Sequence, residues 1–205
     1  MAVAVKICGI TRVEDGLAAA QAGAHAIGLV FHRASPRCIA PDAAAAIVAR
    51  LPPFVTAVGL FVDAEPAQVR AVLDAVPLQL LQFHGDEPPD YCLQFKVRTM
   101  KAFRIRDAES LRELPQYKTN FWLLDAYTPD KPGGTGEKFN WDLAVEAQKL
   151  GRPIFLAGGL TPENVAEAVQ RVRPYGVDVS SGVESAPGRK DHAKVRAFIR
   201  AARAA

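Results

Sequence analysis

Short apolar runs rich in Val, Ile, Leu and Phe alternate with Ala-rich amphipathic stretches along the whole chain. Continuous hydrophobicity in such runs is typical of parallel strands that are covered by helices. Strands are expected at residues 5–9, 26–31, 55–62, 78–83, 98–103, 121–126, 153–158 and 176–181. Helices are expected between and after them, at residues 14–23, 41–51, 65–75, 88–96, 107–114, 141–150, 161–172 and 191–204.

Eight strands, each followed by a helix, predict an α/β fold: a single (βα)8 TIM barrel with eight parallel strands, forming one catalytic domain over residues 1–205. The 205 residues leave about 26 per unit, near the lower limit for this fold, so the barrel has little room for insertions. An open doubly wound sheet is the alternative. It would require a glycine-rich fingerprint after the first strand, where the chain carries only Gly9.

Charge and cysteine content exclude several classes of function. The net charge of +3 is too small, and too evenly spread, to indicate nucleic acid or a membrane surface as a partner. Three cysteines at unrelated spacings and four histidines without ligand spacing indicate neither a disulfide framework nor a metal site. With no signal-peptide pattern and no long apolar run, we expect a cytoplasmic protein, and the sequence leaves open whether it is a monomer or a homodimer.

The loops after the seventh and eighth strands suggest a phosphate site. Gly158 and Gly159 follow one strand, and Ser180, Ser181 and Gly182 follow the other. Glycines let backbone amides approach an anion, and these two loops are where TIM barrels recurrently bind phosphate. Either loop alone could use glycine simply to turn the chain. Together they favour a small phosphorylated substrate.

Cys8 and Asp125 are the candidate acid and base, because each stands at the end of a predicted strand where barrel active sites form. A strand-end cysteine can equally be a small buried apolar residue, and Asp125 can instead order the long loop that follows it. That loop, residues 127–141, is rich in glycine and proline and is a natural lid. Arg33 and Arg37 in the second loop could bind a carboxylate, although most loop arginines are simply solvated.

Several motifs resemble phosphoribosylanthranilate isomerase, a family of tryptophan biosynthesis, over essentially the whole chain. They are KICGIT (6–11), FHGDEP (83–88), LLDAY (123–127), GGTGEKFNW (133–141), LAGGLTPENV (156–165) and VDVSSGVESAPGRKD (177–191). The resemblance implies a (βα)8 barrel and an intramolecular aldose–ketose isomerase that performs an Amadori rearrangement by acid/base catalysis and needs no cofactor.

Three residue roles follow from the resemblance. Cys8 takes the place of the family's general base, Asp125 that of its general acid, and Arg37 that of the arginine that contacts the anthranilate carboxylate. Protonating a ring oxygen requires a protonated carboxyl group, so we expect Asp125 to be partly desolvated with a raised pKa. Cys8 can act as thiolate if its pKa is lowered.

A pairing between Lys6 and Asp178 is a further prediction. The first and eighth strands are neighbours in a closed barrel, and the two side chains share inward parity with Cys8 and Ser180. The pair would place a cation below Cys8 and a carboxylate near the ribose hydroxyls of the substrate.

Three other functions are weighed against this interpretation. A metal-assisted phosphosugar epimerase needs two histidines at strand ends, and only His84 is well placed. A bifunctional isomerase of the analogous histidine-pathway substrate would have aspartate where Cys8 stands. A non-catalytic phosphate-binding protein would not need Cys8, Asp125 or Arg37.

Overall fold

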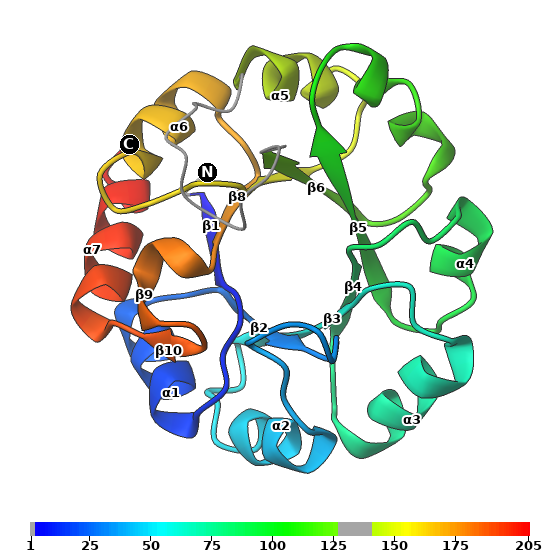
Figure 1. The fold of residues 1–205 in the computed structure, drawn as a ribbon. Coiled ribbons are helices and arrows are strands. Elements are labelled where there is room, and N and C mark those ends of the chain that lie inside the picture. The colour runs from blue at the N-terminus through cyan, green and yellow to red at the C-terminus, as the bar shows by residue number, and fades with distance from the viewer. Residues whose placement is uncertain (1–2, 127–140) are drawn as a thin grey trace.

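The computed structural model describes residues 3–126 and 141–205, in which eight of the strands, β1 to β8, close into an all-parallel barrel. Each strand pairs with the next along the chain, and the last pairs with the first (Figure 1). The predicted fold class is therefore confirmed. The strands are β1 (Ala4–Ile7), β2 (Ala26–Val30), β3 (Thr56–Phe61), β4 (Leu80–Phe83), β5 (Arg98–Ile105), β6 (Phe121–Ala126), β7 (Ile154–Leu156) and β8 (Gly176–Val179).

The α-helices form a ring around the barrel (Figure 1). Proline at the first helical position starts three of them, where its missing N–H costs no hydrogen bond and its fixed φ suits the helix. The helices in the described residues are α1 (Val13–Ala22), α2 (Pro41–Val48), α3 (Pro66–Ala75), α4 (Pro89–Leu93), α5 (Trp141–Gln148), α6 (Val165–Val172) and α7 (His192–Arg203).

The helix expected at residues 107–114 is wrong. Two short 3-10 helices, η1 (Glu109–Leu111) and η2 (Leu114–Gln116), stand between β5 and β6 instead. Asp107 and Ser110 divert the backbone by local hydrogen bonds, since the Ser110 N–H donates to Oδ1 of Asp107 at 3.0 Å. Pro115 has no N–H to continue a helical ladder.

One predicted helix start is also corrected. The sixth helix begins at Val165 rather than near Thr161, because the Thr161 N–H donates to the Asn164 side chain at 2.8 Å and holds the preceding turn. The third helix begins at Pro66, close to the predicted start, and has Glu65 at its N-cap. Asp63 has a left-handed backbone (φ 47°), and its Oδ1 accepts a hydrogen bond from the Asp86 N–H at 2.6 Å.

An unpredicted segment separates β8 from the last helix. It consists of a 3-10 turn, η3 (Ser181–Val183), and a short antiparallel hairpin of β9 (Glu184–Ala186) and β10 (Arg189–Lys190). The hairpin hides in the sequence because its strands are very short and largely polar. It brings Glu184 and Lys190 close to the barrel mouth.

Strand parity separates an inner from an outer core. Val5 and Ile7 point outward into the apolar layer beneath the helices, while Lys6 and Cys8 point inward, as predicted. The inner layer is otherwise almost wholly apolar and is formed by Ala26, Val58, Leu80, Met100, Ala102, Leu123, Phe155 and Ala157. A filled interior of this kind leaves only the mouth of the barrel for chemistry.

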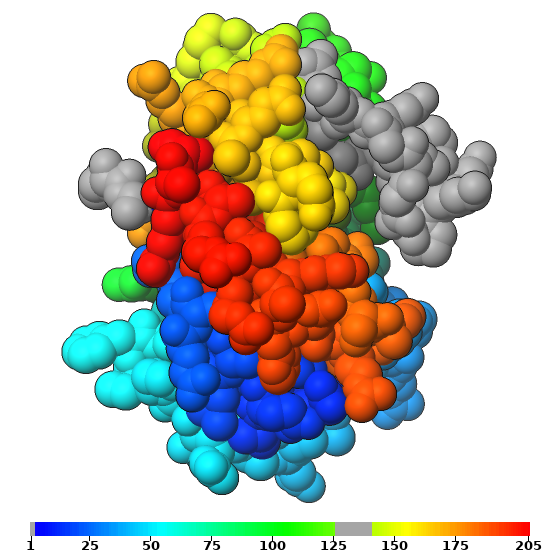
Figure 2. Space-filling view, turned by 90° about the vertical axis from the view of Figure 1, so that its left-hand side faces the viewer, coloured from blue at the N-terminus to red at the C-terminus, as the bar shows by residue number. Residues whose placement is uncertain are grey.

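The C-terminal helix completes the ring. Figure 2 shows α7 in red between α1 in blue and α6 in yellow to orange, and α7 packs against both. Asp15 of α1 ties this corner together, since its inaccessible carboxylate accepts hydrogen bonds from Arg12 at 2.8 Å and from His192 at 2.8 Å. Within the described ranges, none of the helices combines the length and the apolar character required to cross a membrane.

Candidate active site

The candidate residues meet at one end of the barrel because all eight strands run in the same direction. Cys8 follows β1, Asp125 lies near the end of β6, and His84 follows β4. The loops with Gly158 and Ser180 follow β7 and β8. The lid predicted at residues 127–141 lies outside the described residues except for Trp141.

Lys6 and Asp178 form an ion pair inside the barrel, at 2.8 Å between Nζ and Oδ1. The predicted pairing is therefore confirmed. The β1–β8 register sets the two residues directly side by side, and both are almost inaccessible. Burial alone lowers the pKa of Lys6, but Asp178 and the Cys8 thiolate outweigh it and raise the pKa to about 12. Lys6 therefore remains an ammonium ion at neutral pH.

Gly28 makes room for this arrangement. A Cβ atom at Gly28 would lie 2.6 Å from Sγ of Cys8 and 3.0 Å from Nζ of Lys6. Both groups therefore pack against the same bare stretch of β2 backbone, which places the ammonium ion next to the thiol.

Burial raises the pKa of the Cys8 thiol above its ordinary value. The positive charge of Lys6 acts in the opposite direction, and Lys190 adds a smaller effect of the same sign. The condition of a lowered Cys8 pKa is thus not met, because removing water from the thiolate costs more than the nearby cations return.

Asp125 is joined to a short chain of side chains on β4. Nε2 of His84 lies 3.2 Å from Oδ2 of Asp125, and Nε2 of Gln82 lies 3.0 Å from Nδ1 of His84. If the Gln82 amide donates to Nδ1, the imidazole carries its proton on Nε2 and donates it to Asp125. The Asp125 side chain is 30% exposed, which matches the expected partial desolvation.

The loops after β7 and β8 touch through their backbones. A Cβ atom at Gly182 would lie 2.0 Å from the Leu160 carbonyl oxygen, so only glycine allows this approach. Gly158 and Gly159 both have positive φ, 81° and 67°. No acceptor within the described ranges receives a hydrogen bond from the amides of Gly158 and Gly159, which leaves them available to an anion.

Two buried polar atoms in this region have no hydrogen-bond partner among the described residues: Oε1 of Gln82 and Oγ of Ser180. An unpaired polar atom is costly unless a ligand or water completes it. Gln82 interrupts the apolar run LLQF with an inward-facing amide. That interruption is the signal that could have identified it from the sequence.

Arg37 is held by a carboxylate that the sequence reasoning missed. Its Nε and Nη2 atoms donate to the two oxygens of Glu184 at 2.8 and 2.7 Å. Lys190 donates to Oε1 of the same carboxylate at 2.8 Å. Arg33, the other candidate in this loop, is exposed. Glu184 and Lys190 lie within the last resemblance motif, which was the available signal for them.

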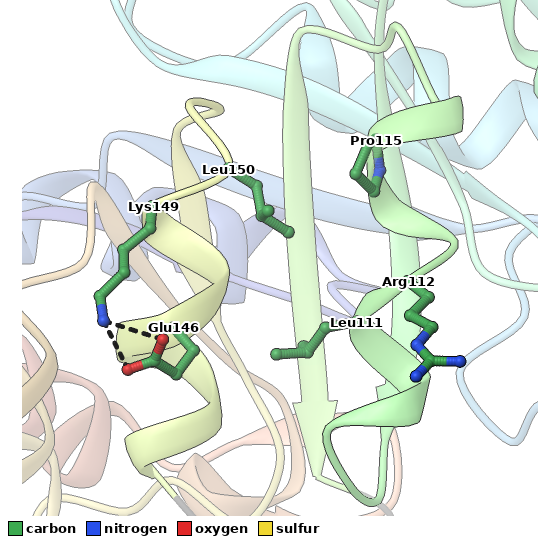
Figure 3. A pocket seen from close by; sticks show the side chains of 6 residues that line it. All are labelled: Leu111, Arg112, Pro115, Glu146, Lys149 and Leu150. Atoms are coloured by element: carbon green, nitrogen blue, oxygen red, sulfur yellow. Dashed lines mark hydrogen bonds and ion pairs between the residues drawn. The ribbon is translucent and has the colours of Figure 1, made fainter.

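A pocket of about 290 Å³ lies elsewhere, on the outer wall between the 3-10 segment and the end of α5 (Figure 3). Leu111, Pro115 and Leu150 give it an apolar lining, and Lys149 pairs with Glu146 at its edge. It includes none of the candidate residues. Residues 3–126 and 141–205 contain no group of three or more His, Cys, Asp or Glu side chains that could hold a metal ion.

A family profile and a similar protein both identify the same enzyme family. The profile of the family described as N-(5'phosphoribosyl)anthranilate (PRA) isomerase matches residues 5–201. The N-(5'-phosphoribosyl)anthranilate isomerase of Trichlorobacter lovleyi is 58% identical over 99% of both chains.

Solved structures agree in fold. Phosphoribosyl anthranilate isomerase from Thermotoga maritima is 41% identical, with a TM-score of 0.94 over 99% of this chain and 100% of that one. A second structure of that protein describes monomers generated from the dimer. A further phosphoribosyl anthranilate isomerase, in complex with reduced 1-(o-carboxyphenylamino)-1-deoxyribulose 5-phosphate, is 39% identical over 99% of this chain and 100% of that one, with a TM-score of 0.90.

Proposed function

The chain belongs to the N-(5'-phosphoribosyl)anthranilate isomerase family, and from this premise we propose how its own residues carry out the reaction. The substrate is N-(5-phosphoribosyl)anthranilate and the product is 1-(2-carboxyphenylamino)-1-deoxyribulose 5-phosphate, in tryptophan biosynthesis. The observation that carries the proposal is the placement of Cys8 and Asp125 at the ends of strands β1 and β6, at the same mouth of the barrel as the glycine loops after β7 and β8.

Asp125 is the general acid of the first step. It delivers a proton to the ring oxygen while the nitrogen lone pair forms a C=N bond and the C1′–O bond breaks. The products of this step are an open-chain iminium ion and the Asp125 carboxylate. The position of Asp125 supports this role, because its side chain lies at the end of β6, is 30% exposed at the mouth of the barrel and is oriented by its contact with His84.

Cys8 is the general base of the second step. Its thiolate removes the proton from C2′, whose acidity the neighbouring iminium group raises. The electron pair of that C–H bond forms a C1′–C2′ double bond and neutralises the nitrogen. The resulting enolamine tautomerises to the ketose product. Lys6 supports this step because its ammonium ion, next to Cys8, stabilises the thiolate.

Two anionic groups anchor the substrate at its ends. The phosphate binds at Gly158, Gly159, Ser180, Ser181 and Gly182, whose two loops meet through backbone contact. The anthranilate carboxylate binds Arg37. Fixing both ends holds the reacting carbons between base and acid, which lowers the entropic cost of reaching the transition state.

Asp178 and Gln82 contact the ribose hydroxyls in this proposal. Oδ1 of Asp178 is bound to Lys6, so its second oxygen is the one we assign to a hydroxyl. The unpartnered Oε1 of Gln82 is a second acceptor that a hydroxyl would complete.

The remaining expectations are part of the same proposal. Residues 1–205 form a single catalytic domain that works in the cytoplasm without a cofactor or metal ion. The protein acts as a monomer or homodimer, both of which are described for the T. maritima relative.

The decisive experiment follows the fluorescence of freshly made phosphoribosylanthranilate. Pure, folded protein should quench it faster than spontaneous decay, with the product identified by mass and chromatography. No acceleration would instead favour a phosphate-binding protein without turnover. In that case inorganic phosphate should still bind, as measured by titration calorimetry.

A further inference from the structure

Glu184 holds two cations at once. Both of its oxygens accept hydrogen bonds from Arg37, and Oε1 also accepts from Lys190 at 2.8 Å and from the Gly188 N–H at 3.3 Å. Its side chain is 5% exposed. Burial alone raises the pKa of Glu184, but the hydrogen bonds from Arg37 and Lys190 outweigh it and hold the pKa below its usual range. Glu184 is therefore a carboxylate at neutral pH.

The bidentate contact fixes the plane of the Arg37 guanidinium. A guanidinium group has five N–H donors in a rigid fork, and Glu184 engages the edge formed by Nε and Nη2. The end formed by the two terminal nitrogens is a second fork of the same kind, suited to a planar carboxylate. An arginine without such a partner would spread over many rotamers and lose entropy on binding.

The same cluster lies beside Cys8. A Cβ atom at Gly9, the residue after Cys8, would lie 2.5 Å from Cδ of Arg37 and 3.0 Å from Oγ of Ser180. Arg37 therefore lies across the backbone next to the thiol. Lys190 also donates to the Ser180 carbonyl oxygen at 3.2 Å, which ties the cluster to the loop after β8.

We propose that Glu184 is a positioning residue that presents the free end of Arg37 to the substrate carboxylate and holds Lys190 against the loop after β8. This inference rests on the proposed function, since it concerns how that substrate is bound. Glu184 itself touches no reacting atom. It acts through Arg37 and Lys190.

The ionisation of the Cys8 thiol depends on the charges in this cluster, and it provides a readout that a merely structural role of Glu184 would not change. The positive charges of Arg37 and Lys190 both interact with the Cys8 thiolate, and Glu184 partly cancels them. Glu184→Gln removes the negative charge and keeps the size of the side chain. The Cys8 thiol should then ionise at lower pH. Glu184→Asp keeps the charge but shortens the arm, so it should disturb the geometry and leave the Cys8 titration near that of the wild type.

The experiment compares wild type, Glu184→Gln, Glu184→Asp and Asp15→Asn. Asp15 is a matched control, because it is also a buried carboxylate that binds an arginine. Its contact with the cluster is to the backbone N–H of Lys190, at 3.2 Å, rather than to Arg37 or to the Lys190 ammonium group. We expect KM for phosphoribosylanthranilate to rise about tenfold or more in both Glu184 variants, with a smaller change in kcat, because a charge-assisted contact to the carboxylate is misplaced. Asp15→Asn should lower Tm and leave KM unchanged.

A product analogue with an anilino group in place of the carboxyphenylamino group tests the Arg37 route directly. Wild type should bind this analogue more weakly than the parent compound, and the Glu184 variants should lose little further affinity for it. An equal loss for both ligands, or an unchanged KM in folded Glu184→Gln, would overturn the inference. If that variant does not fold, Glu184→Asp decides by the same criterion. Failure of the wild type to turn over substrate would instead contradict the proposed function.

Discussion

The ammonium nitrogen of Lys6 lies 2.8 Å from Oδ1 of Asp178, one layer below Cys8 in the interior of the barrel. A buried ion pair is a weak source of net stability, because desolvation offsets much of the attraction. The ion pair matters here because it fixes the positions of two charged groups. It holds a permanent cation against the thiol and a carboxylate at the floor of the site, next to the apolar inner cluster of the described residues.

Removing the Lys6 charge should raise the pKa of the Cys8 thiol further, because the ammonium ion stabilises the thiolate. The pH dependence of Cys8 alkylation by iodoacetamide measures this in a Cys38→Ser background, which removes the exposed thiol. Lys6→Met should shift the alkylation profile to higher pH. An unshifted profile would show that Lys6 does not act on Cys8. Lys6→Met also leaves Asp178 buried and unpaired, so a loss of about 3 kcal/mol in the free energy of unfolding should accompany it.

Cys8→Ala and Asp125→Asn should each lower kcat by about 100- to 10,000-fold, the usual contribution of one positioned proton transfer. Affinity for inorganic phosphate should survive in both variants, because the loops after β7 and β8 are untouched. Steady-state kinetics and calorimetric titration provide the two measurements. Near-normal kcat in Cys8→Ala would rule out that residue as the base.

His84→Ala should lower kcat about tenfold, since Asp125 loses the side chain that lies 3.2 Å from its Oδ2 and orients it. Gln82 should not replace His84 as the partner of Asp125, because the Gln82 amide contacts Nδ1 of His84. His84→Gln places an amide donor on an arm of similar length and should recover part of the loss. Equal kcat in wild type and His84→Ala would remove His84 from the mechanism.

Gly182→Ala should weaken phosphate binding. The added Cβ would lie 2.0 Å from the Leu160 carbonyl oxygen and would force the two glycine loops apart. A shift of this kind should lower kcat/KM on the order of 100-fold. Gly151→Ala is the control for backbone strain, because Gly151 has a left-handed φ of 85° but no atom within 4 Å of the new Cβ, whereas Gly182 is not among the glycines with positive φ and meets the clash instead. Similar kinetic losses in both variants would indicate general backbone strain instead.

Asp15→Asn should destabilise the protein by about 2 kcal/mol at neutral pH, because the inaccessible carboxylate loses its charge-assisted bonds to Arg12 and His192. Burial raises the pKa of Asp15, but these partners outweigh it and lower the pKa overall. A depressed folded-state pKa contributes stability above the unfolded-state pKa, near 3.8, and that stability is lost as pH falls through the lower folded value. Urea titrations between neutral pH and pH 3 should therefore show a shallower acid loss in the variant.

The barrel could be predicted from the sequence because its signal is local and repeated. Each strand is a continuous apolar run, and eight such runs alternating with helical segments allow few other arrangements. Because side chains alternate between the two faces of a strand, the inward direction of Lys6 and Cys8 could also be predicted from the sequence alone. The helix expected at residues 107–114 failed because Asp107, Ser110 and Pro115 provide competing local hydrogen bonds and remove a donor.

The sequence by itself determined the barrel, the strand-end positions of Cys8 and Asp125, and the pairing of Lys6 with Asp178, since all three depend on strand order and a two-residue period. Only the tertiary structure decided the pKa shifts of the site residues and the side chains with which they pair. The pKa of Cys8 depends on burial from several strands, and the grip of Glu184 on Arg37 spans 147 positions along the chain. No local pattern encodes such a contact, because it arises when the barrel closes and brings the loop after β2 against the hairpin after β8.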